Sequence, residues 1–139
     1  MYLDMVLRVA LLLLCTWFSY TDLRSRVIPN RITHPVLFAL LLFRMIVSPQ
    51  YLWGLVPAVF LLTIFMLKPG AVGAGDVKLV SIVGVVLGLE RVILPLLVMC
   101  FAVLGYTGVR RLLRLSKFVS VPLAPFMWVG LVVELSSIS

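Results

Sequence analysis

The sequence predicts an all-α protein, a polytopic membrane helix bundle with about six transmembrane helices. Of its 139 residues, 63% are hydrophobic, and the mean hydropathy is +1.23, whereas an ordinary soluble domain is roughly 45 to 50% apolar. The apolar residues form stretches that are separated by short segments with polar residues, proline or glycine. A bilayer solvates such an apolar surface directly, which water does not. We expect one membrane domain over residues 1–139.

Six apolar stretches define the expected helices. Several are shorter than the roughly 20 residues that cross a bilayer core unaided, so neighbouring helices or local thinning of the bilayer must make up the difference. The first stretch follows Arg8 as in a signal peptide, but no small-x-small cleavage site follows it, and we expect it to remain as a helix. The predicted spans are 3–21, 32–48, 51–67, 75–89, 92–109 and 119–136.

The basic residues predict the orientation of this bundle. The formal net charge is +7, but lysine and arginine fall at the ends of apolar runs and form no stripe with interleaved aromatic residues, so no nucleic acid is expected as a partner. Most of them fall in the three links that share one side of a six-span topology. The positive-inside rule makes that side cytoplasmic and both termini external. The cytoplasmic set is Arg24, Arg26, Arg31, Lys68, Lys78, Arg110, Arg111, Arg114 and Lys117; the external set is Arg8, Arg44 and Arg91.

Two of the five acidic residues are expected to share a site. Asp4, Glu90 and Glu134 fall near external helix ends, where a solvated carboxylate needs no explanation. Asp22 and Asp76 are 54 positions apart but are predicted at the same depth on the cytoplasmic side. Two carboxyl groups in a partly dry site cannot both ionise cheaply, so such a pair can share acid and base roles around one water molecule. Alternatively, each carboxylate only neutralises a nearby arginine or lysine at the membrane surface.

The residues around Asp76 allow two interpretations. Gly70, Gly73 and Gly75 let the backbone leave helical geometry and let another chain approach closely. Asp76 would begin an apolar helix, where free amides and the helix dipole favour its charged form. The alternative is a flexible interhelical turn with an ordinary N-cap. Lys78 either orients the Asp76 carboxylate or reaches the membrane interface.

Other polar and small residues are expected to have structural roles. Asn30, after Pro29, can cap a helix that enters at Ile32, and His34 is interpreted as an interfacial helix residue rather than a catalytic or metal-binding one. The cysteines have no CxxC spacing, so we expect core thiols and no metal or cofactor site. Small pairs suit close helix packing within the bundle. The cysteines are Cys15 and Cys100, and the small pairs are Gly84 with Gly88 and Gly105 with Gly108.

Three segments together resemble a known family. Asp22 is followed by RVIPN (26–30), GAGDVKL surrounds Asp76, and VPLAPF (121–126) lies near the end of the chain. In this order they are similar to the prepilin peptidases, the type IV leader peptidases, which are membrane aspartyl proteases of the GxGD type. The resemblance implies Asp22 and Asp76 as the catalytic pair, with Gly73, Gly75 and Lys78 as supporting residues.

The resemblance also implies a substrate and a location. The expected reaction is removal of the basic leader of type IV prepilins or pseudopilins at the cytoplasmic face of the bacterial inner membrane, without a cofactor or metal. Prepilin and membrane lipid are the expected partners, and GxxxG spacing is too common in membrane helices to decide an oligomeric state. Larger family members add a domain with paired CxxC motifs associated with N-methylation. Because this chain has none, we expect a peptidase only, similar to those of Tad (Flp) pilus systems.

Two other classes of protein remain open from the residues alone. A small transporter can use membrane carboxylates to couple protons, although its charges would be expected near the bilayer midplane rather than near an edge. A non-catalytic scaffold of a pilus assembly platform would use the same helices. Such a scaffold would tolerate replacement of either aspartate by asparagine, which a protease would not.

Overall fold

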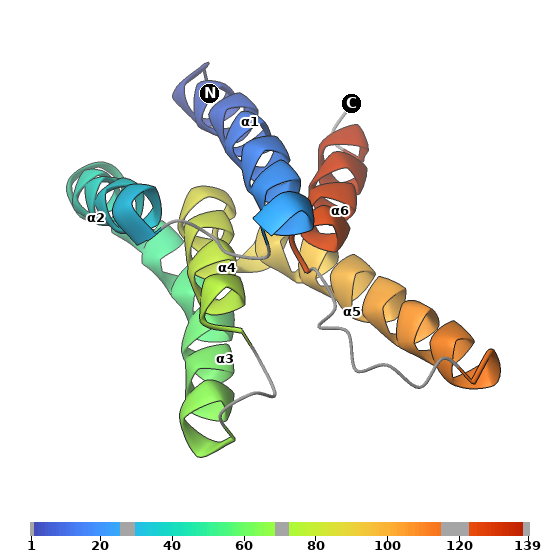
Figure 1. Ribbon diagram of the computed structural model, residues 1–139. Coiled ribbons are helices and arrows are strands. Elements are labelled where there is room, and N and C mark those ends of the chain that lie inside the picture. Colours follow the sequence, from blue (N-terminus) through green and yellow to red (C-terminus); the bar gives the residue numbers. More distant parts are fainter. Residues whose placement is uncertain (1, 26–29, 69–72, 115–122, 138–139) are drawn as a thin grey trace.

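The computed structural model describes residues 2–25, 30–68, 73–114 and 123–137, and within these ranges every regular element is a helix. The all-α prediction is therefore confirmed, and Figure 1 shows the arrangement of the helices. The helices are α1 (Tyr2–Ser25), α2 (Asn30–Val47), the 3-10 helix η1 (Pro49–Leu55), α3 (Val56–Leu67), α4 (Ala74–Leu87), α5 (Leu89–Leu112) and α6 (Ala124–Ser136).

Four segments are long and apolar enough to cross a membrane: Tyr2–Arg24, Asn30–Val47, Pro49–Leu67 and Leu89–Leu112. The chain is therefore a multi-pass membrane protein. The predicted fourth and sixth spans correspond to the shorter helices α4, of 14 residues, and α6, of 13 residues. Fourteen helical residues extend only about 21 Å, against a hydrocarbon core of about 30 Å. The start of the predicted span 119–136 lies outside the described residues.

The centre of the bundle is α4, which contacts α1, α2, η1, α3 and α5. Helix α4 therefore lacks the single apolar face of a surface helix, and its neighbours cover it on all sides. In Figure 1 it lies in the middle, between α2 and α3 on one side and α1 and α6 on the other. Its buried residues are Val77, Leu79, Val80, Ser81, Ile82, Val83, Gly84, Val85, Val86 and Leu87.

Helices α1 and α6 pack side by side in opposite directions, so the start of α1 and the end of α6 lie at the same end of the protein (Figure 1). The indole Nε1 of Trp128 on α6 donates a hydrogen bond of 2.9 Å to Thr16 Oγ1 on α1. Helix α6 also crosses α5 closely, because a Cβ atom at Gly130 would lie 2.6 Å from the Pro95 carbonyl oxygen. Glycine at this position lets the two backbones touch.

The small residues differ in their roles. Gly84 packs against Gly54 of η1, and a Cβ atom on either would lie 1.9 to 2.0 Å from the carbonyl oxygen of the other. The prediction of close packing is confirmed for Gly84, but Gly88 instead ends α4 with a φ of +79°. For Gly105 and Gly108 the prediction was wrong, since no described atom lies within 4 Å of a Cβ at either position.

Several polar residues that we expected at solvated helix ends are buried. Arg44 is 1% exposed; its guanidinium forms an ion pair of 3.1 Å with Asp4, donates a hydrogen bond of 2.9 Å to the Val86 carbonyl, and lies 3.8 Å from the centre of the Tyr51 ring. Glu134 is 3% exposed and lies 3.8 Å from Arg91. These charges are buried because of how the helices cross, which hydropathy does not predict. Each buried charge lies next to a partner of opposite charge.

The two cysteines also differ from each other. Cys15 of α1 is 1% exposed and belongs to the apolar core, as expected. Cys100 of α5 is exposed, so the expectation of a core thiol was wrong there, because no described helix covers that face of α5. His34 is exposed on α2.

Candidate active site

Asp22 lies within the last turn of α1, which extends one turn beyond the predicted span. The polar side chains next to Asp22 form hydrogen bonds within α1. Thr21 Oγ1 donates to the carbonyls of Trp17 (2.9 Å) and Phe18 (3.0 Å), and the Arg24 guanidinium donates to the Tyr20 hydroxyl (3.0 Å). The Thr21 hydroxyl bonds back to its own helix, as threonine does inside helices, and α1 continues through this polar sequence to Ser25. As a result, α1 carries Asp22 as a half-buried helical residue rather than as part of a link.

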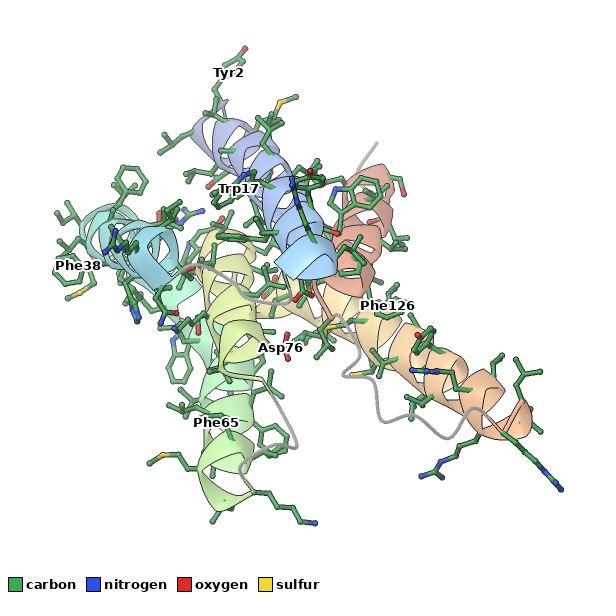
Figure 2. All side chains as sticks on the ribbon, in the orientation of Figure 1. Tyr2, Trp17, Phe38, Phe65, Asp76 and Phe126 are labelled. Atoms are coloured by element: carbon green, nitrogen blue, oxygen red, sulfur yellow. The ribbon has the colours of Figure 1, made fainter. Side chains whose placement is uncertain are left out.

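Asp76 occupies the third position of α4, and the N-cap residue Gly73 holds its carboxylate. Gly73 is in an extended conformation, with φ −77° and ψ 142°. Its amide N–H donates a hydrogen bond of 3.1 Å to Asp76 Oδ2, and the Asp76 amide donates one of 3.1 Å to the Gly73 carbonyl. A carboxylate near a helix N-terminus is also favoured by the helix dipole. The backbone therefore holds the Asp76 carboxyl group in one place. Figure 2 labels Asp76 at the start of α4.

The structure brings Asp22 and Asp76 together. Helix α1 packs against α4, and the two carboxyl groups are close enough to interact electrostatically. Asp76 is half-buried, as is Asp22. Their helices come from distant parts of the sequence, and the interaction arises only because the end of α1 meets the beginning of α4.

Glycine at residue 73 leaves room for the Asp76 carboxylate in its present place. A Cβ atom there would lie 2.8 Å from Asp76 Oδ2, closer than real Cβ contacts. A larger residue would therefore push the carboxyl group away from its present place, at little cost to the backbone. Gly75 is the second residue of α4 and is half-buried, while Gly70 lies outside the described residues.

The side chain of Lys78 extends from α4 to α2. Its ammonium group donates a hydrogen bond to Asn30 Oδ1. Asn30 is the first residue of α2, so the expectation of a cap for a helix that enters at Ile32 was wrong. Sequence reasoning missed this pair because nothing local links positions 30 and 78. The only available signal was that both are polar residues at helix starts on the same predicted side.

The arrangement can support acid and base chemistry. Two interacting carboxyl groups in a partly buried site favour a state in which one is charged and the other keeps a proton. Such a pair can take a proton from water and give one to a leaving group. Within the described ranges, no group of three or more His, Cys, Asp or Glu side chains is placed to hold a metal ion.

The fold and this site define a class: a multi-pass helical membrane protein with two interacting carboxyl groups at the adjoining ends of two helices. Residues 9–108, well over half of the chain, match the type IV leader peptidase family, and the chain belongs to that family of proteases. The matched range includes both Asp22 and Asp76. No curated protein and no solved structure matches the chain.

Proposed function

We propose that the protein is an aspartic endopeptidase that removes the basic leader of type IV prepilins or pseudopilins, with Asp22 and Asp76 as its catalytic pair. One observation carries the proposal. The only aspartates on the predicted cytoplasmic side, 54 positions apart, have interacting carboxyl groups in a chain that belongs to a leader peptidase family. Two carboxyl groups are what an aspartic mechanism requires.

In the proposed mechanism, the ionised aspartate accepts a proton from a water molecule as the water oxygen attacks the scissile carbonyl carbon. The other aspartate, which holds a proton, donates it to the leaving amine nitrogen as the peptide C–N bond breaks. The two carboxyl groups titrate as a pair, so the starting proton belongs to the pair rather than to one residue. Gly73 contributes by holding the Asp76 carboxylate through its amide.

The proposed location of the catalytic pair follows from the distribution of arginine and lysine over the helices. Arg24, Arg110 and Arg111 lie in the last turns of α1 and α5, and Lys78 lies near the start of α4. We assign this side to the cytoplasm of the bacterial inner membrane by the positive-inside rule. The apolar segment of a pilin precursor would lie in the bilayer against the bundle, with its leader junction at the level of both carboxyl groups.

The proposed activity is cleavage only, as in the short peptidases of Tad (Flp) pilus systems. The chain has two cysteines and no CxxC pair. Helices α1 and α2 are separated only by residues 26–29, which leaves no room there for a cysteine-rich module. We place the peptidase activity in the membrane domain of residues 1–139.

The test is processing of a co-expressed prepilin by Asp22→Asn and Asp76→Asn variants. We expect unprocessed prepilin with either variant at normal membrane levels of the enzyme. The matched control is Glu90→Gln, which removes an exposed carboxylate from the first turn of α5 and should leave processing intact. Normal processing by both aspartate variants would refute the proposal and favour a scaffold, while proton-coupled flux in vesicles would favour a transporter.

A further inference from the structure

Helix α4 is joined to α2 by polar side chains near both of its ends. Near the start of α4, the Lys78 ammonium donates to Asn30 Oδ1. Near its end, the Arg44 guanidinium of α2 donates to the Val86 carbonyl at 2.9 Å. Both bonds connect groups far apart in the sequence, so they report on how α4 is held in the bundle rather than on its own helical structure.

Lys78 and Asp76 lie on opposite sides of α4. Two positions along a helix correspond to a rotation of roughly 200°. Consistent with this geometry, Asp76 interacts with Asp22 of α1, while Lys78 bonds to Asn30 of α2. A rotation of α4 about its axis that breaks the Lys78–Asn30 bond would therefore also turn Asp76 away from Asp22.

The first residues of α4, at its catalytic end, are less buried than the rest of the helix: Ala74 is exposed, and Asp76 and Lys78 are half-buried. The buried residues of α4 itself are mostly aliphatic, and half of them are valine, so similar side chains face its different neighbours. A polar contact is a known way to select one register among similar apolar packings. The contact of Gly84 with Gly54 fixes the other end of α4, but Gly73 and Ala74 at the catalytic end are exposed.

We infer that Lys78 is a positioning residue, whose hydrogen bond to Asn30 sets the rotation of α4 that aims the Asp76 carboxyl group at Asp22. This role rests on the proposed function, because it gives the geometry of that function's catalytic pair. Lys78 contacts neither the substrate nor the water molecule in this proposal. It acts through the orientation of the helix that carries Asp76.

The first test is kinetic and uses the full-length enzyme in proteoliposomes with a prepilin substrate. Lys78→Met keeps the aliphatic stem and removes the donor. We expect kcat to fall about tenfold, as small misplacements of a catalytic group do, while KM stays unchanged. Asn30→Ala should have the same effect, and the double variant should be no worse than either single one because both remove the same bond. Lys78→Arg, which keeps a donor, should restore most of kcat.

The matched control is Lys68→Met, which removes an exposed lysine just after α3 and should leave kcat unchanged. Thermal unfolding in detergent identifies any variant that fails to fold. A general loss of stability would lower the amount of active enzyme without separating Lys78→Arg from Lys78→Met. Unchanged kcat in both Lys78→Met and Asn30→Ala would overturn the inference, although the aspartate variants would still test the proposed function.

A second test does not need catalysis. In a chain with Cys15→Ala and Cys100→Ala, the substitutions Asp22→Cys and Asp76→Cys introduce a thiol pair that a short bifunctional reagent can join. We expect efficient crosslinking in this background and a reaction about fivefold slower when Lys78→Met is added, because the thiols would be less well positioned. Equal crosslinking rates with and without Lys78→Met would overturn the inference. Slower crosslinking in a protein whose parent fails to cleave prepilin would keep the positioning role and remove the protease.

Discussion

The two ends of α4 are built differently. At its C-terminal end, the helix backbone touches η1 at Gly84, its Val86 carbonyl accepts a hydrogen bond from the buried Arg44, and Gly88 ends it with a positive φ. At its N-terminal end, Gly73 and Ala74 are exposed, and Asp76 is half-buried. The hydrogen bond from Lys78 to Asn30 ties this end to α2.

This difference separates stability from activity within one short helix. Within a membrane, close backbone packing and interhelical hydrogen bonds drive the association of helices. A site that must admit a peptide and a water molecule is drawn from the less constrained part of a fold. We therefore expect substitutions at the C-terminal end of α4 to lower the free energy of unfolding, and substitutions at its N-terminal end to lower the rate of cleavage.

The largest expected loss of stability is for Arg44→Met. The change removes an ion pair with Asp4, a hydrogen bond to Val86 and a contact with the Tyr51 ring. Together these should cost about 3 kcal/mol of unfolding free energy, seen as a lower midpoint of thermal unfolding in detergent. Arg24→Met, at an exposed arginine, is the control and should change the midpoint little. Equal unfolding midpoints for Arg44→Met and Arg24→Met would contradict the expected difference between the two ends of α4.

Gly84→Ala should cost about 2 kcal/mol, because its methyl group would meet the Gly54 carbonyl and force α4 and η1 apart. Gly105→Ala is the matched control, since no described atom lies near that position. It should be neutral or stabilise the protein by up to about 1 kcal/mol through helix propensity. Equal losses for both glycines in chemical or thermal unfolding would contradict the contact at Gly84.

Gly88→Ala should cost about 1 to 2 kcal/mol, because its φ of +79° is unfavourable for a residue with a Cβ atom. The Tyr51 ring, 3.0 Å from the position of that Cβ, adds a close contact. The folded fraction of this variant should cleave prepilin at the normal rate per molecule. A lower rate of cleavage per folded molecule would show that the two ends of α4 are not separate in function.

The smallest effect on stability is expected for Gly73→Ala, below about 1 kcal/mol, since its φ of −77° suits alanine. The new methyl group would displace Asp76 Oδ2, which lies 2.8 Å from its position. We therefore expect kcat to fall at least about tenfold without a change in the unfolding midpoint. Ala74→Ser, at the exposed neighbour, should keep normal kcat. Normal cleavage by Gly73→Ala would show that the Asp76 position is not critical.

The sequence alone determined the class of protein and the local form of the site. Hydropathy fixed the number and approximate positions of the helices, because the cost of burying polar groups in lipid acts on each stretch separately. Asp76 after the glycines indicated a helix start for a similarly local reason, since free amides and the helix dipole favour a carboxylate there. The family resemblance named Asp22 and Asp76 as partners, and the tertiary structure then placed the two carboxyl groups within electrostatic reach.

Only the tertiary structure decided which helices meet and which charges are buried. The contact between Gly54 and Gly84, the burial of Arg44 and Glu134, the exposure of Cys100 and the bond from Lys78 to Asn30 all depend on helix crossings between distant segments. In a chain of mostly hydrophobic residues, many helix pairings satisfy hydropathy equally well. Close backbone approach and a few polar contacts select one of them, and neither is visible until the helices are assembled.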